Sequence, residues 1–313
     1  MKVRDGLDIF LPKVICEFLE IMKIDTNELQ EIRMNIGQPL IFKVVGKEVI
    51  PNKNGRETWG YKEAFIVTEE LLRNTFEFIC KHSVYAYEEE IRQGFLTIEG
   101  GHRVGLAGQA VLEANKVKNL KYISGLNIRM ASEVKGCAQK VLPFIEHYEG
   151  IYDTLIISPP CSGKTTLLRD CIRLLSDGEG GRGGVRVGVV DERGEIGACY
   201  HGVPQNDLGA RTDILDRMPK TEGILMLIRS MAPRVIAVDE IGTASDMEAL
   251  YNASLSGCCI LATIHGKSPL EISEKPAFRY IRHHNIFQRY IVLEPGKLGE
   301  VKGIYDENFN EIS

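Results

Sequence analysis

The residues with the clearest chemical meaning lie in the stretch SPPCSGKTT, residues 158–166. It matches the phosphate-binding pattern GxxxxGK[ST], except that serine stands where the first glycine belongs. In such a loop, backbone N–H groups surround a phosphate, the lysine reaches the β- and γ-phosphates, and a hydroxyl binds Mg²⁺. Serine is small and can follow a path similar to that of glycine, so we expect a working loop with a looser fit. The predicted nucleotide-binding residues are Ser158, Pro159, Pro160, Cys161, Ser162, Gly163, Lys164, Thr165 and Thr166, with Thr165 as a metal ligand.

A pair of acidic residues follows another apolar stretch, RVIAVDEIG. It reads as a buried strand that delivers Asp239 and Glu240 at its C-terminal end, the edge where ligands bind in open α/β sheets. Asp239 could hold the Mg²⁺ shell, and Glu240 could orient or deprotonate the attacking water. Paired acids at a strand end are also common in solvated turns, but the preceding phosphate loop favours a catalytic role.

Two further strand ends carry polar residues toward the same edge. VGVVDERGE places Asp191 and Glu192 there, where they could help position metal or water; an ion pair with Arg193 is an equally good interpretation. CCILATIHG ends with Thr263 and His265, and a polar residue at this place can sense a γ-phosphate. The convergence of three strand ends on one edge is the strongest signal for a site.

The elements that position these residues form an alternating series in residues 133–313. Apolar strands and helices follow one another, which predicts an α/β domain with a parallel sheet and a terminal hairpin around Pro295-Gly296. Residues 1–132 instead show a helix near 11–22, strand-like segments, a helical stretch from 69 to about 93, and a hairpin or meander. We therefore predict a smaller α+β domain over residues 1–132, followed by an α/β domain over residues 133–313 that carries the P-loop on a parallel sheet.

Charge and composition exclude several classes of protein. Residues 1–132 hold 18 Lys and Arg against 18 Asp and Glu, and the remainder holds 20 against 25, so neither half is basic and nucleic-acid binding is not favoured. The N-terminus lacks the apolar segment of a signal peptide, and no apolar run reaches the roughly 20 residues that span a bilayer. The eight cysteines form no CxxC pair, which fits a reduced cytoplasmic setting.

The chain resembles the sporulation stage III AA family, within the RecA-like secretion ATPase superfamily that includes pilus-motor and type II and type IV secretion ATPases. The resemblance lies in five segments of the second half, SPPCSGKTTLLRD, VVDERGEIG, GVPQNDLGARTDILD, MLIRSMAPRVIAVDEIG and ILATIHG. It continues into the first half through GFLTIEGGHRVGLAG and LKYISGLNIRMA. Several long motifs in a fixed order make it specific over most of the chain.

The resemblance implies that residues 133–313 form a RecA-like P-loop ATPase domain and that the protein is a hexameric ATPase. It also implies a role for each strand-end residue. Asp191 and Glu192 match the acidic box, Asp239 and Glu240 the Walker B acids, and His265 the histidine box. The acidic box and Walker B then supply Asp191 and Asp239 as metal ligands, and Glu192, Glu240 and His265 as catalytic residues.

The resemblance also assigns two arginines of the first half. In relatives, paired arginines of the N-terminal domain reach nucleotide in the ring, and the matching positions are Arg103 and Arg129. The chain departs from the pattern at Ser158 and at Asn35, where relatives tend to carry a second arginine.

We therefore expect a cytoplasmic Mg²⁺-dependent ATPase that forms a homo-oligomeric ring. By resemblance, it powers or assembles a sporulation channel between mother cell and forespore and reaches the membrane through membrane protein partners, without direct lipid binding. Two alternatives stay open: an ATPase acting on nucleic acid, and a nucleotide-regulated assembly factor with little hydrolysis.

Overall fold

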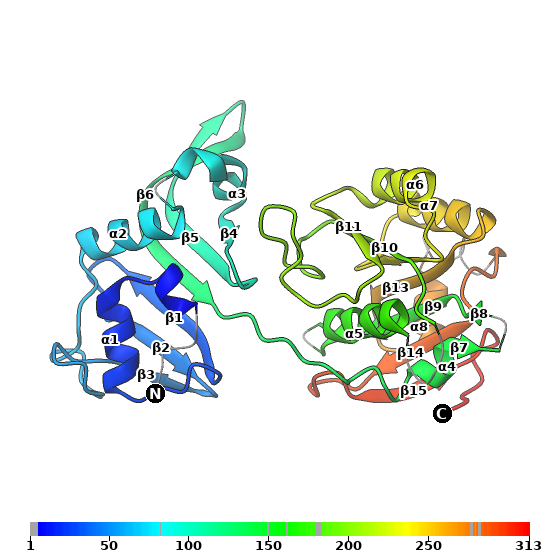
Figure 1. Cartoon of the computed structure of the whole chain (residues 1–313), viewed down its shortest axis with the longest axis horizontal. Coiled ribbons are helices and arrows are strands. Elements are labelled where there is room, and N and C mark those ends of the chain that lie inside the picture. The colour runs from blue at the N-terminus through cyan, green and yellow to red at the C-terminus, as the bar shows by residue number, and fades with distance from the viewer. Residues whose placement is uncertain are drawn as a thin grey trace. The chain divides into compact units, whose positions relative to one another are not determined.

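The computed structural model describes residues 6–313 except 82, 149, 161, 179–182, 276–277, 279 and 281–282. The chain divides into two compact units, Met1–Ser132 and Glu133–Ser313 (Figure 1). Each unit has its own sheet.

The first unit is built on an antiparallel sheet with the strand order β3-β2-β1-β6-β5-β4. Its strands are β1 (Leu29–Asn35), β2 (Ile41–Val44), β3 (Lys47–Val49), β4 (Phe95–Thr97), β5 (Arg103–Glu113) and β6 (Lys116–Arg129). Its helices are η1 (Leu7–Ile9), α1 (Lys13–Ile21), α2 (Glu69–Ile79), η2 (Val84–Tyr87) and α3 (Glu88–Gln93). Alternate residues such as Ile32, Val104 and Ile128 are buried, while Arg33 and Arg129 of the same strands are exposed. One face of the sheet thus forms the core, and the other carries polar side chains.

The predicted helix from 69 to about 93 is interrupted. The helix α2 ends at Ile79, and Lys81 adopts a left-handed backbone with φ 47°. A short 3₁₀ segment and α3 then continue the chain in a new direction.

The second unit is an α/β domain, as predicted. Within its described residues the main sheet has the order β11-β10-β12-β13-β9-β14-β15, parallel except for the terminal antiparallel pair. The strands are β9 (Thr154–Ser158), β10 (Val187–Asp191), β11 (Thr212–Asp216), β12 (Val235–Val238), β13 (Cys259–His265), β14 (Arg289–Leu293) and β15 (Val301–Tyr305), with β7 (Glu146–His147) and β8 (Gly150–Ile151) as a separate pair. The helices are α4 (Leu142–Ile145), α5 (Lys164–Asp177), α6 (Lys220–Ser230), α7 (Ala244–Leu255) and α8 (Pro269–Glu274).

Two apolar clusters cover the two faces of this sheet. Leu155 and Ile157 of β9 pack with residues of α6, α7 and α8, whereas the intervening Ile156 packs with residues of α4 and α5. The strands are therefore buried on both sides, which explains their nearly continuous apolar sequences. The terminal hairpin is confirmed as β14 and β15.

The parallel register brings the strand ends together at one edge. Ser158 of β9 lies opposite His265 of β13, and Val238 of β12 lies between Ala262 of β13 and Val190 of β10. The phosphate loop follows Ser158, Asp239 follows Val238 and Asp191 follows Val190, so the predicted site residues meet at this edge. In the part of the chain that the structure describes, none of the helices combines the length and the hydropathy needed to cross a membrane.

Candidate active site

The first position of the phosphate loop does not require glycine in this chain. Ser158 is the last residue of β9, is fully buried, and pairs in the sheet with His265. Its carbonyl accepts the N–H of Gly266 at 3.2 Å, and its hydroxyl donates to the carbonyl of Pro159 at 2.6 Å. Extended backbone is open to any residue, so serine fits here without strain. Pro160 continues the turn, and Cys161 lies outside the described residues.

The second glycine is required by its surroundings. Gly163 has φ 86° and directly precedes α5. A Cβ atom at this position would lie 2.6 Å from the backbone nitrogen of Gly299 and 3.2 Å from Cδ1 of Leu298, both in the turn between β14 and β15. The N–H of Gly299 donates to the carbonyl of Ser162 at 2.9 Å. The C-terminal hairpin therefore supports the phosphate loop, a contact that the sequence did not predict.

The loop offers polar groups that suit a phosphate. The hydroxyl of Ser162 is buried and has no hydrogen-bond partner in the described part of the chain. The first turn of α5 follows it, and the N–H groups of a first helical turn have no intrahelical partner. A buried hydroxyl and free N–H groups at a helix N-terminus fit an anionic ligand.

The phosphate-loop lysine and threonine face the predicted Walker B acids. Lys164 is buried, and its Nζ lies 2.5 Å from Oε1 of Glu240 and 3.6 Å from Oδ1 of Asp239. The hydroxyl of Thr165 donates to Oδ2 of Asp239 at 2.6 Å. Thr166 lies in the same helical turn. The structure thus assembles residues that are about 75 positions apart in the chain, as expected for a P-loop site.

Glu240 is held in an uncommon backbone conformation. Its φ is 50°, and its N–H donates to the hydroxyl of Thr263 and to Oδ1 of Asp239, both at 2.9 Å. The Thr263 hydroxyl in turn donates to Asp239. A left-handed backbone conformation at a non-glycine residue destabilises the folded protein by on the order of 1–3 kcal/mol, and such residues concentrate at functional sites. Thr263 therefore positions both acids from the neighbouring strand.

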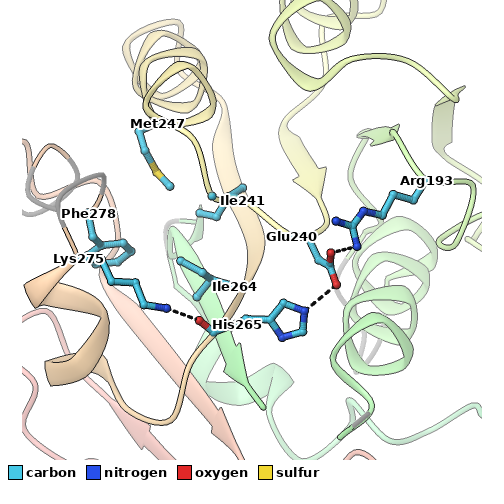
Figure 2. Close-up of a pocket in the computed structure, with 9 residues that line it drawn as sticks. Arg193, Glu240, Ile241, Met247, Ile264, His265, Lys275 and Phe278 are labelled. Carbon is cyan, nitrogen blue, oxygen red and sulfur yellow. Dashed lines mark hydrogen bonds and ion pairs between the residues drawn. The ribbon is translucent and has the colours of Figure 1, made fainter. Parts of the chain in front are cut away.

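His265 contacts the same carboxylate. Its Nε2 lies 2.8 Å from Oε1 of Glu240, as Figure 2 shows, and the ring is 45% exposed. Burial and the nearby charge of Lys164 lower the pKa of His265 below its usual 6.5. The ring is therefore neutral at pH 7, and because a carboxylate only accepts, the hydrogen lies on Nε2.

Asp191 binds its own loop. Its carboxylate accepts the N–H groups of Glu195, Ile196 and Gly197 at 2.8–2.9 Å. Burial raises the pKa of Asp191 to about 6. Arg169 of α5 holds the same loop by donating to the carbonyls of Ile196 and Glu195 at 2.9 and 2.8 Å. The metal role of Asp191 stays a prediction, and its observed contacts are those of a residue that orders the segment after β10.

The neighbours of Asp191 form ion pairs. Glu192 pairs with the buried Lys220 at the start of α6. Arg193 pairs with Oε2 of Glu240, the predicted Walker B glutamate, whereas the ion pair considered from the sequence was with the adjacent acids Asp191 and Glu192. The role of Glu192 in water positioning stays a prediction. Lys220 and Arg169 were not recognised from the sequence, because a lysine or arginine in a helix carries no signal of its partner.

Arg103 and Arg129 are neighbours in the first unit. They lie directly opposite each other on β5 and β6, and Glu31 of β1 lies on the other side of Arg129. The Arg103 guanidinium stacks 3.8 Å above the Phe95 ring, and Nε of Arg129 lies 3.9 Å from Oε2 of Glu31. The two arginines therefore share one face of the sheet. Their contact with nucleotide stays a prediction.

A cavity of about 600 Å³ opens beside Glu240 and His265 (Figure 2). Its apolar walls are Ile241, Met247, Ile264 and Phe278, and its remaining lining comes from Arg193, Glu240, Gly242, His265 and Lys275. The Lys275 ammonium donates to the carbonyl of His265 at 2.7 Å. The carboxylate of Glu240 thus lies between the phosphate-loop lysine and a largely apolar cavity.

Comparisons with known proteins agree with this architecture. Residues 1–312 match the family model described as Sporulation stage III, protein AA. Stage III sporulation protein AA of Bacillus subtilis (strain 168) is 39% identical over 295 residues, covering 94% of this chain and 92% of that protein. Two solved structures share the fold. The ATPase DotB of Legionella pneumophila has a TM-score of 0.57 at 16% identity, over 90% of this chain and 76% of that one. The pilus retraction motor PilT has a TM-score of 0.57 at 13% identity. The match covers 88% of this chain and 77% of the PilT chain. The predicted resemblance and RecA-like fold are confirmed.

Proposed function

The chain belongs to the Sporulation stage III, protein AA family, and we propose that it is a Mg²⁺-dependent ATPase. We propose further that its turnover powers or assembles a membrane channel complex between mother cell and forespore during sporulation. The name of the Bacillus subtilis relative supports the sporulation role, and the arrangement of the site supports the chemistry.

One observation carries the ATPase proposal. Lys164 and Thr165 lie within hydrogen-bond distance of Glu240 and Asp239, at the C-terminal edge of a parallel sheet. These are the groups that bind phosphates, hold a metal and orient a water in phosphoryl transfer. His265 adds a neutral hydrogen-bond donor at the same carboxylate.

The residues present fit a Mg²⁺ that arrives with the nucleotide. Thr165 and Asp239 would hold it, since a hydroxyl and a carboxylate oxygen already lie 2.6 Å apart. Among the described residues no group of three or more His, Cys, Asp or Glu is arranged to hold a metal ion. Mg²⁺ commonly binds through one or two protein ligands plus substrate phosphates. When bound, it would neutralise the charge of the phosphates.

Two substitutions separate binding from chemistry. Lys164→Ala should weaken ATP binding and abolish turnover, because the phosphate-loop cation is lost. Glu240→Gln should keep ATP binding and lose turnover, because an amide cannot accept the proton of water. Lys302→Ala, an exposed lysine of β15, is the matched control and should hydrolyse ATP like the wild type. Wild-type turnover in Glu240→Gln would remove Glu240 from its assigned role.

The ring and its arginines form a second part of the proposal. Arg103 and Arg129 would act on the nucleotide of a neighbouring subunit, where a guanidinium can stabilise the charge of the transferring phosphoryl group. Mixing Arg103→Ala with Lys164→Ala subunits should then restore partial turnover through mixed interfaces. Full turnover in Arg103→Ala/Arg129→Ala protein would refute this role.

The membrane connection is proposed to run through protein partners. The protein should stay in the supernatant with vesicles of anionic lipid and sediment with membranes that contain its cognate channel components. The physical reason is the net charge of −5 without a basic half. Tight, salt-sensitive binding to protein-free vesicles would contradict the proposal.

A further inference from the structure

The carboxylate of Glu240 is shared between two cations. Lys164 and His265 contact Oε1, and Arg193 contacts Oε2. A carboxylate with both oxygens engaged in this way has little room to hold an attacking water. At least one of these partners must therefore leave before Glu240 can act as proposed.

Arg193 reaches Glu240 from an ordered segment. Asp191 binds three N–H groups of residues 195–197, and Arg169 binds the carbonyls of Glu195 and Ile196. The adjacent Glu192 pairs with the buried Lys220. These contacts hold the backbone on both sides of Arg193.

The side chain of Arg193 is largely exposed to solvent, although it pairs with Glu240. It is 59% exposed, whereas that of its partner Glu240 is 12% exposed. Figure 2 shows its guanidinium pointing toward the carboxylate of Glu240, and both side chains line the cavity. An exposed guanidinium on a fixed backbone can change partners without rearrangement of the loop.

A bound nucleotide would compete with Glu240 for Lys164 and Arg193. The γ-phosphate carries more charge than one carboxylate and binds the phosphate-loop lysine, so Lys164 leaves Glu240. Lys164 and Arg193 contact the two oxygens of the same carboxylate, so a phosphate that takes Lys164 also lies within reach of Arg193. A guanidinium can donate two parallel hydrogen bonds to two oxygens of one phosphate, which favours the change of partner of Arg193 from Glu240 to the phosphate.

We propose that Arg193 moves from Glu240 to the γ-phosphate and is the residue by which this site distinguishes nucleoside triphosphate from diphosphate. The inference rests on the proposed ATP-binding function. The same movement frees Oε2 of Glu240 to hold the attacking water. The apolar walls of the adjacent cavity, such as Ile264 and Phe278, limit the number of competing waters.

An alternative is that Arg193 forms an ordinary surface ion pair. Exposed ion pairs contribute little to stability, and such a pair would leave nucleotide affinity unchanged. The two possibilities therefore differ in nucleotide discrimination, which a purely structural role does not affect.

The test is calorimetric titration with Mg²⁺ and either ADP or the non-hydrolysable triphosphate AMP-PNP. In Arg193→Gln, the dissociation constant for AMP-PNP should rise about 10- to 100-fold, the loss expected for one charge-assisted hydrogen bond to phosphate, while that for ADP changes less than about threefold. Arg193→Lys should lie between wild type and Arg193→Gln. Arg229→Gln, on the exposed side of α6, is the control and should bind both nucleotides like the wild type.

The outcomes are separable. Equal changes for both nucleotides, or no change for either, in Arg193→Gln would overturn the role of Arg193 and leave the ATPase proposal standing. A wild-type protein that binds neither nucleotide would overturn both. Unfolding curves of Arg193→Gln that match the wild type would show that a change in affinity is not a loss of fold.

Discussion

Replacing Gly163 by alanine tests the support of the phosphate loop by the C-terminal hairpin. Two costs add at this position. The first is the left-handed backbone, φ 86°, which costs an alanine roughly 1–2 kcal/mol. The second is the collision of the new Cβ with the backbone of Gly299, because a contact of 2.6 Å forces the turn to move.

Moving the turn also breaks the hydrogen bond from Gly299 to the carbonyl of Ser162, worth about 1 kcal/mol. Overpacking of this kind adds about 1–3 kcal/mol. We therefore expect Gly163→Ala to lower the free energy of unfolding by about 3–6 kcal/mol and to abolish nucleotide binding.

Gly296→Ala is the matched control. Gly296 lies in the same turn with φ 76°, but a Cβ there would meet no atom within 4 Å. Only the backbone cost of about 1–2 kcal/mol applies, and nucleotide affinity should stay within about threefold of wild type. Urea unfolding followed by far-UV circular dichroism and titration with Mg²⁺-ATP measure both effects. Equal losses of stability in the two variants would refute the argument that the hairpin restricts Gly163.

Three further predictions follow from single residues. Ser158→Gly should lower stability by about 0.5–1 kcal/mol without tightening Mg²⁺-ATP binding, because the position is an extended strand residue; a tenfold gain in affinity would contradict this. Burial raises the pKa of Asp153 to about 6 from 3.8, because the ionised carboxylate is unfavourable in the folded protein. The free energy of unfolding should therefore fall as the pH rises from about 4 to 6 and Asp153 ionises. Asp153→Asn keeps an acceptor for the N–H of Ile260 and should therefore stabilise the protein by up to about 3 kcal/mol at pH 8 but not at pH 4, as urea unfolding at the two values will show. The pKa of His265 is lowered, so the loss of kcat/KM for ATP that protonation of His265 causes should occur below pH 6.5. A loss that already occurs above pH 7 would show that the ring is not neutral at that pH.

The parts of the site that depend on local sequence order could be predicted. The phosphate loop needs only a strand before it and a helix after it, and β9 and α5 are recognisable from their apolar patterns. The strand ends at Asp239 and His265 could be predicted for the same reason. In a parallel sheet the C-terminal ends of the strands lie at one edge, independently of the conformation of the connecting loops.

Other features depend on contacts that the sequence does not encode locally. The strand β11 cannot be recognised from the sequence because TDILD mixes polar and apolar residues and lies half-buried at the sheet edge, without an apolar run. An aspartate after a strand can face a metal or fold back onto its own loop. Asp191 folds back because residues 195–197 turn their N–H groups toward it. Such a turn is decided by tertiary packing, including Arg169 of a distant helix.

The position of β9 between β13 and β14 has a consequence for how the protein is made. Its neighbours in the sheet are β13 and β14, which lie more than 100 residues later in the chain, and the turn at Gly299 completes the phosphate loop. During synthesis the nucleotide-binding loop therefore emerges from the ribosome long before the segments that hold it. A nascent chain cannot assemble its phosphate loop until β14 and the turn at Gly299 are available. Ribosomes that stop before residue 299 would thus release fragments without a finished phosphate loop.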